Sequence, residues 1–112
     1  NMSGLNFDRY QELAARTSNP GLEMLLRRAV AGLGVAAEGG EVADIIKKEV
    51  GHGHPEDVEK IGKELGDVLW YVAEIATLYG PSMEQIAYEN IRKLKARYPE
   101  GFSEERSINR VD

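Results

Sequence analysis

Cysteine is absent from this sequence of 112 residues. Its absence excludes disulfide bonds, thiolate nucleophiles and metal sites with sulfur ligands, and it fits a reducing compartment. We therefore expect the protein in the cytoplasm. The sequence also has no run that approaches the roughly 20 apolar residues of a membrane helix, so we expect no membrane partner.

Basic residues are few and scattered. Lys and Arg number 14 against 19 Asp and Glu, which gives a net charge of −5. Since Lys and Arg supply most of the affinity of nucleic-acid-binding proteins, we expect no nucleic-acid partner. The hydrophobic share of 42% is typical of a globular protein, and the length fits one domain over residues 1–112. Residues 1–4 and 103–112 are expected to be flexible or extended ends.

Alternating β-branched and aromatic residues, the mark of strands, are missing as well, whereas helical periodicity recurs along the chain. The predicted fold class is all-α. Turn and cap residues divide the sequence into four expected helices, at about 5–16, 21–50, 55–79 and 81–97. The expected architecture is a four-helix bundle completed by oligomerisation.

Glycine is abundant inside these expected helices. Each glycine there costs about 1 kcal/mol relative to alanine, so helix propensity does not explain them. A missing side chain allows another helix or a ligand to approach the backbone closely. The positions concerned are Gly32, Gly34, Gly39, Gly40, Gly62 and Gly66.

Acidic residues occur at unusual positions on the helical wheel. Glu38 projects from within the apolar arc of the second expected helix, and Glu41 follows on an adjoining face. On the third helix, Glu64, Asp67 and Tyr71 recur at i, i+3 and i+7 along the border of the apolar stripe. Burying several carboxylates together is costly unless cations or protons neutralise them. The pattern therefore predicts a metal site, and salt bridges to lysines are the alternative.

The ligand types indicate the metal. Four carboxylates without sulfur or helical histidine favour Mg²⁺, with Mn²⁺ as the alternative, over zinc or copper. A di-iron site would use Glu-x-x-His pairs, whereas His52 and His54 fall in a glycine-rich loop. We interpret both histidines as loop residues.

The fourth expected helix carries the complementary charge. Asn90, Lys93 and Arg97 recur at i, i+3 and i+7 on one face, where they could bind phosphate. Lys47 and Lys48, in the last turns of the second helix, are further candidates. Lysines at that position also compensate the helix dipole.

Together these motifs resemble the MazG-like nucleotide pyrophosphohydrolases, an all-α superfamily. The family has Glu-x-x-Glu on one helix and Glu-x-x-Asp on the next, and here the pairs are Glu38-Gly39-Gly40-Glu41 and Glu64-Leu65-Gly66-Asp67. The segments DVLWY at 67–71, ENIRKL at 89–94 and RYPEGF at 97–102 are similar to family segments that follow in the same order. The resemblance covers about residues 22–102.

The resemblance implies hydrolysis of a nucleoside triphosphate, either an NTP or a dNTP, to the monophosphate and pyrophosphate. It also implies a role in nucleotide housecleaning. It implies Mg²⁺ ligands at Glu38, Glu41, Glu64 and Asp67, with Glu38 or Glu41 as general base. Substrate contacts are expected from five residues, namely Asn90, Lys93, Arg97, Tyr71 and Lys48. Many family members carry a further glutamate where this sequence has Ala37. The absence of this glutamate affects the tuning of the metal site more than the reaction.

The resemblance also implies a homodimer or homotetramer. Trp70 lies off the main stripe of its helix, so that it is an interface residue, a core residue or a base-stacking residue. Two other functions remain open: a phosphoribosyl-ATP pyrophosphohydrolase-like enzyme and a non-catalytic helical interaction module. The preferred base and sugar and the number of metal ions do not follow from the sequence.

Overall fold

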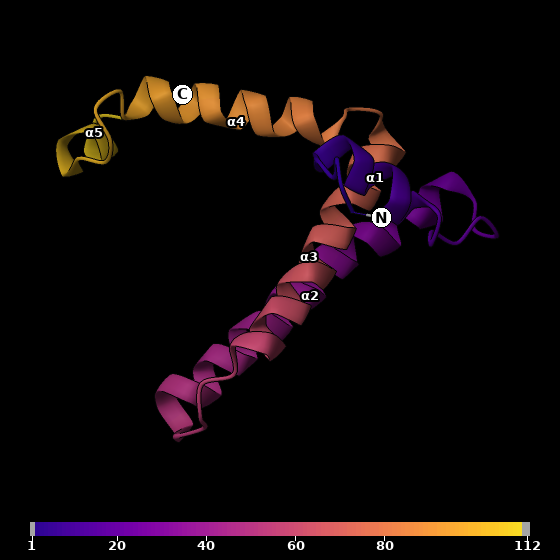
Figure 1. Ribbon diagram of the computed structural model, residues 1–112, viewed down its shortest axis with the longest axis horizontal. Helices are drawn as coiled ribbons and strands as arrows, with labels where there is room; N and C mark the ends of the chain where they lie inside the picture. Colours follow the sequence, from indigo (N-terminus) through magenta and orange to yellow (C-terminus); the bar gives the residue numbers. More distant parts are fainter. Residues whose placement is uncertain (1, 111–112) are drawn as a thin grey trace.

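The computed structural model describes residues 2–110 and contains only helices in that range (Figure 1). In chain order the helices are α1 (Phe7–Ala15), α2 (Met24–His52), α3 (Val58–Tyr79), α4 (Met83–Arg97) and α5 (Glu104–Ile108). The all-α class is confirmed, and the four expected helices are present with ends shifted by a few residues. Within residues 2–110, no helix combines the length and the apolar character needed to cross a bilayer.

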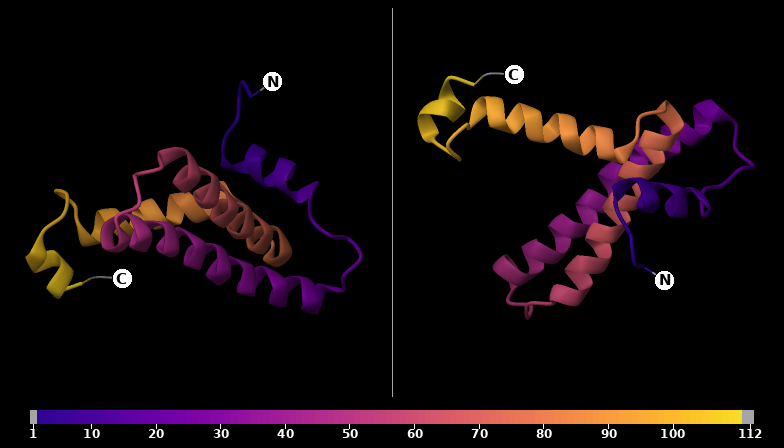
Figure 2. Two further views of the ribbon diagram at one scale, coloured as in Figure 1. Left: turned by 90° about the horizontal axis from the view of Figure 1, so that it is seen from below. Right: turned by 45° about the horizontal axis from the view of Figure 1, so that its top comes forward.

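Helices α2 and α3 form a long antiparallel hairpin (Figures 1 and 2). Gly53 ends α2 in the left-handed region at φ +73°, which glycine adopts without strain. The Asp57 side chain then accepts a hydrogen bond from the Lys60 backbone N–H at 3.0 Å. Because Asp57 is the N-cap, α3 begins at Val58, and the expected start at Pro55 was three residues too early.

The short helix α1 packs on α3 on the side of the hairpin away from α2 (Figure 2). Gln11 links it to the α3–α4 turn: its Nε2 donates to the Thr77 hydroxyl and the Pro81 carbonyl, both at 3.2 Å. Its Oε1 accepts from the Met83 backbone N–H at 2.7 Å. Around this junction lies the main core, formed by Ala14, Ala73, Ala76 and Met83 with Tyr10, Leu69, Trp70 and Val72 packed against it. Trp70 is thus partly a core residue.

One of the six helical glycines has a clear packing role. A Cβ on Gly34 would collide with the Tyr71 ring, which lies directly against the α2 backbone. A Cβ added to any of the other five glycines would meet no atom within 4 Å. For these five, the chain itself therefore does not provide the close neighbour that the sequence led us to expect. They are Gly32, Gly39, Gly40, Gly62 and Gly66.

Helix α4 leaves the hairpin as an arm (Figure 1). Its first turn is fixed to α1, since Asp8 accepts from the Glu84 backbone N–H at 3.0 Å and Glu84 accepts from the Phe7 backbone N–H at 3.1 Å. Further along, Ile91 and Leu94 are 51% and 39% exposed. In the single chain, therefore, α4 does not pack along α2 and α3 as a fourth member of a bundle.

The chain is extended for its length. Its radius of gyration is 17.1 Å, against about 13 Å for a compact domain of this size. Its solvent-accessible surface is 8244 Å², whereas a compact monomer would expose about 6,100 Å². About 2,100 Å² of surface is thus in excess.

The C-terminal segment differs from the expectation. Instead of an extended tail it forms α5, because the Ser103 side chain caps the helix by accepting from the Arg106 backbone N–H at 3.0 Å. Residues 1 and 111–112 of the expected flexible ends lie outside the described residues.

Candidate metal centre

Three of the four predicted acidic ligands come together between α2 and α3. Carboxylate oxygens of Glu38, Glu64 and Asp67 lie within 4.8 Å of one another. The glutamates are half-buried and Asp67 is exposed. Tyr71 follows one turn after Asp67, so that the Gly34–Tyr71 contact sets how closely the two helices approach next to the carboxylates. We refer to Glu38, Glu64 and Asp67 as the carboxylate cluster.

Electrostatics make Glu38 the most perturbed member of the carboxylate cluster. Its pKa is raised above the ordinary glutamate value, first by desolvation and then by the negative charges of Asp67 and Glu64. A hydrogen bond with Glu64 and the charge of Glu41 add to the shift. A raised pKa means that ionising Glu38 is less favourable than ionising a free glutamate, and nearby positive charge would offset this difference.

The donor set fits a hard divalent cation. Three carboxylates on two rigid helices converge, and the sequence contains no cysteine. Oxygen donors with net negative charge are the ligands that Mg²⁺ and Mn²⁺ prefer. The raised pKa of Glu38 is the expected signature of carboxylates held together without a counterion.

Glu41 lies outside the carboxylate cluster. It is exposed, and its charge contributes to raising the pKa of both Glu38 and Lys48. Glu41 is therefore close enough to influence the cluster without forming part of it. Its role as a ligand or general base stays a prediction.

Lys48 lies beyond Glu41 on α2. Its ammonium group contacts Asp44 at 2.8 Å, and Lys47 contacts the same carboxylate at 3.2 Å. The hydrogen bonds from Lys48 and Lys47 lower the pKa of Asp44, and the bond to Asp44 raises the pKa of Lys48. Lys48 also lines a cavity of about 260 Å³ together with Glu41 and Glu64. A predicted substrate residue thus shares a cavity with two predicted ligands.

The two histidines differ in position. His54 lies in the α2–α3 connection as expected and lines the same 260 Å³ cavity. His52 is the last residue of α2 and not a loop residue. Neither belongs to the carboxylate cluster.

Tyr10 is a neighbour of the cluster that the sequence interpretation missed. Its pKa is raised by desolvation and by the charge of Asp67. Tyr10 lies on α1, which no motif connects to the acidic pairs, and only the packing of α1 on α3 brings it near. The phenol group is therefore close enough to Asp67 to be influenced by its charge.

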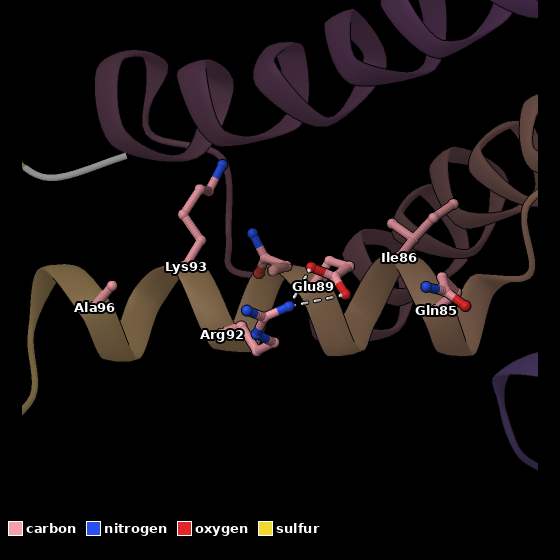
Figure 3. Close-up of a pocket in the computed structure, with 7 residues that line it drawn as sticks. Gln85, Ile86, Glu89, Arg92, Lys93 and Ala96 are labelled. Atoms are coloured by element: carbon pink, nitrogen blue, oxygen red, sulfur yellow. Dashed lines mark hydrogen bonds and ion pairs between the residues drawn. The ribbon is translucent and has the colours of Figure 1, made fainter.

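The predicted phosphate-binding face lies apart from the carboxylate cluster in the single chain. Asn90 and Lys93 line a hollow of about 650 Å³ whose seven lining residues all belong to α4 (Figure 3). The Lys93 side chain extends away from the helix, while Arg92 turns to Glu89 at 3.2 Å. Arg97 is half-buried at the end of α4. Because one helix supplies every lining residue, the hollow has no opposite wall within the chain.

The chain is similar in sequence to known proteins. The sequence model of a family described as the MazG nucleotide pyrophosphohydrolase domain matches residues 31–102, well over half of the chain. The Gene 37 protein of Mycobacterium phage L5 is 32% identical over 82 residues, which cover 70% of this chain and 72% of the phage protein. No solved structure matches the chain. The family match includes all four predicted acidic ligands and the three polar residues of α4.

Proposed function

Because the chain belongs to the MazG nucleotide pyrophosphohydrolase family, we propose that it hydrolyses nucleoside or deoxynucleoside triphosphates between the α and β phosphates. The products are the nucleoside monophosphate and pyrophosphate. Removal of unwanted nucleotides from the cellular pool is the role we propose for this reaction. The observation that carries the proposal is the convergence of Glu38, Glu64 and Asp67 within 4.8 Å.

Mg²⁺ is the proposed cofactor, with Mn²⁺ as a substitute. Glu38, Glu64 and Asp67 would hold it, and Glu41 would join them as the fourth ligand. A bound divalent cation supplies the positive charge that offsets the triphosphate and makes the attacking water more acidic. A protein with a net charge of −5 would otherwise repel a polyanionic substrate.

The remaining steps belong to side chains of the chain itself. Glu38 or Glu41 accepts the proton of the attacking water. Lys48, in the cavity that Glu41 and Glu64 also line, donates to a phosphate oxygen. The Tyr71 ring packs against Gly34 and forms the boundary of the site at the end nearer the start of α2.

A second copy of the chain is the proposed partner. The excess surface of about 2,100 Å² exceeds the roughly 800 Å² that each partner contributes to a standard interface. Exposed residues on α4, including Ile91 and Leu94, are apolar, as the core of a subunit interface usually is. The hollow that Asn90 and Lys93 line also needs an opposite wall from another element. We propose a homodimer or homotetramer in which α4 completes the bundle and meets the phosphates.

Pyrophosphate release tests the reaction directly. The protein is incubated with each canonical NTP and dNTP and with phosphoribosyl-ATP, in the presence of Mg²⁺, Mn²⁺ or a chelator. We expect divalent-dependent release of pyrophosphate and the monophosphate from nucleoside triphosphates. The Glu59→Gln variant is a matched control, because Glu59 is an exposed carboxylate on α3 paired with Lys63.

The product pattern separates the alternatives. If phosphoribosyl-ATP is the only compound hydrolysed, nucleoside triphosphates are not the substrates, and the protein is a phosphoribosyl-ATP pyrophosphohydrolase-like enzyme. Absence of turnover, together with a melting temperature that does not respond to Mg²⁺, would favour a non-catalytic helical module.

A further inference from the structure

Helix α2 has an apolar face that its own chain leaves uncovered. The buried residues of α2, Ala31 and Gly34, lie on the side of α3, and α2 runs along an edge of the molecule with α1 and α3 on that side (Figure 2, left). The opposite side carries exposed residues at alternating spacings of three and four positions. These residues, which we refer to as the α2 seam, are Leu26, Ala29, Leu33, Ala36, Gly40 and Ala43.

The distribution of charge on α2 is the reverse of that on an ordinary surface helix. A surface helix directs its charged residues at solvent and its apolar residues at the core. No residue of the α2 seam is charged, and Leu26 and Leu33 are 50% and 72% exposed. Glu38, by contrast, lies on the side of α3, beside Glu64 and Asp67. A helix that is apolar on its solvent side as well as on its core side is expected to be covered on both sides.

The spacing of the α2 seam indicates what kind of element covers it. Apolar residues that alternate at three and four positions form the contact line of paired helices, in which side chains of one helix fill holes in the surface of the other. Among the positions that directly flank the seam, only Asp44 is charged, and its carboxylate is paired with Lys47 and Lys48. The covering element is therefore a helix with an apolar line of its own.

The sizes of the seam residues favour α2 of a second copy in the antiparallel direction. Both leucines lie in the N-terminal half of the seam, and the small residues Gly40 and Ala43 lie in the C-terminal half. In an antiparallel pair, Leu26 lies opposite Ala43 and Leu33 lies opposite Ala36, so that each leucine meets a small residue. In a parallel pair, leucine would meet leucine and Gly40 would meet Gly40, which leaves voids between the helices. The seam thus complements itself when one copy is reversed.

The surface area of the chain supports an occupant of this size. Obligate homodimers bury about 2,000–5,000 Å² in total, or roughly 1,000–2,500 Å² per chain. The excess surface of this chain, about 2,100 Å², falls in that range. One extensive interface therefore accounts for the α2 seam and the exposed face of α4 together.

We propose that α2 pairs with α2 of a second copy along the α2 seam, antiparallel and related by a two-fold axis. Ala29 of each chain then lies opposite Gly40 of the other, and the two backbones come closest in this layer because neither residue has a large side chain. The exposed face of α4 belongs to the same dimer, so that disrupting either surface releases monomers. The proposal rests on the proposed assembly, for which it specifies the surface, and is independent of the proposed reaction.

Cysteine pairing tests the direction and the register of the two helices, because the sequence has no cysteine of its own. The double variant Ala29→Cys/Gly40→Cys should become a disulfide-linked dimer under mild oxidation. Within one chain the two positions are about 16 Å apart along the helix, which is too far for a disulfide. In an antiparallel pair, each single variant places its two cysteines equally far apart, so Ala29→Cys and Gly40→Cys alone should stay unlinked. Non-reducing gel electrophoresis distinguishes the products.

Leu33→Asp tests the α2 seam without cysteines. Leu33 is 72% exposed in the single chain, so the substitution leaves the fold of the chain intact, whereas in the dimer it buries a charge. We expect the dissociation constant of the dimer, measured by sedimentation, to rise about 100-fold. Val50→Asp is the matched control, because Val50 is 80% exposed on the same helix and lies beyond the last seam residue. Its dissociation constant should equal that of the wild type.

The outcomes separate the proposals from one another. Disulfide-linked dimers of both single variants would mean a parallel pair, and an oligomer that survives Leu33→Asp and leaves the double variant unlinked would use another surface. Either result would overturn the proposed seam and leave the proposed assembly intact. A wild-type protein that is monomeric would overturn both. A linked double variant, with no pyrophosphate release by the wild type, would support the seam and reject the proposed reaction.

Discussion

The Tyr71 ring of α3 lies against the backbone of Gly34 on α2, where a Cβ would collide with the ring. This contact occurs one turn from Glu38 on α2 and one turn from Asp67 on α3. The separation of the helices at the carboxylate cluster therefore depends on the absence of a side chain at residue 34.

Gly34→Ala should destabilise the protein and weaken metal binding. The new methyl group forces the half-buried Tyr71 ring to move, at a cost of about 1–3 kcal/mol in the free energy of unfolding. Gly32→Ala, where a Cβ meets open space, is the matched control and should stabilise α2 by up to about 1 kcal/mol. Chemical denaturation with and without Mg²⁺ measures both effects. Equal stability changes in the two variants would contradict the packing role of Gly34.

Glu38→Gln and Asp67→Asn should each lower kcat/KM by about 100-fold or more. Each substitution keeps the size of the side chain and removes one charge from the carboxylate cluster. Because like charges then repel less, both variants should be at least as stable as the wild type when metal is absent. Pyrophosphate release and thermal unfolding in chelator give the two quantities. Full activity in both variants would exclude the carboxylate cluster as the metal site.

The metal-free protein should become more stable as the pH falls through the raised pKa of Glu38. The folded state holds this proton more tightly than the unfolded state, so protonation favours folding. The contribution is complete below the ordinary glutamate pKa and is lost as the pH rises through the folded-state pKa. Unfolding curves measured in chelator at several pH values should show this dependence, and Glu38→Gln should lack it. Parallel pH profiles for the two proteins would be inconsistent with the shift.

Lys93→Ala should raise KM for the triphosphate by about tenfold and weaken inhibition by pyrophosphate. Lys93 extends from α4, and Glu89, the carboxylate that lines the same hollow, pairs with Arg92 (Figure 3), so the natural partner of Lys93 is an anion. Mg²⁺ binding measured without nucleotide should be unchanged. If Lys93 also holds the departing pyrophosphate, kcat should fall as well. Lys95→Ala, an exposed lysine on the same helix, is the control, and identical kinetics of both variants would make Lys93 an ordinary surface residue.

Ile91→Asp should convert the proposed oligomer into monomers. Ile91 is 51% exposed on an arm that packs on little of its own chain, and a buried charge in the interface would be costly. Sedimentation velocity on the wild type and the variant measures the state, and activity should fall with dissociation because α4 carries Asn90 and Lys93. A wild-type protein that sediments as a monomer would refute the proposed assembly.

The parts of the molecule that depend on local periodicity could be predicted from the sequence. Helix positions follow from spacing and capping, and Glu38, Glu64 and Asp67 could be assigned to a common site because three- and four-residue spacing fixes the face of a helix. The same spacing places Glu74 on the face of Asp67 and Tyr71, so a signal for its burial was present in the sequence.

The parts that depend on how helices pack could not be predicted in this way. The direction of α4 follows from the hydrogen bonds of Gln11 and Asp8 with residues more than 60 positions away. The proximity of Tyr10 to Asp67 likewise arises from tertiary packing of α1 on α3. Such contacts leave no periodic trace in a single sequence, because each involves a single side chain and a partner far away along the chain.

The small interior of the chain has a consequence for the folding of the proposed oligomer. Among residues 2–110, six apolar side chains are buried and four of these are alanines, whereas ordering each residue costs about 1–2 kcal/mol. So little buried apolar surface offsets only part of the lost chain entropy, and the second copy that we propose would add to it by covering the exposed residues. In the proposed oligomer, folding and association would be one bimolecular event, so that the protein refolds faster, and unfolds at a higher denaturant concentration, as its concentration rises.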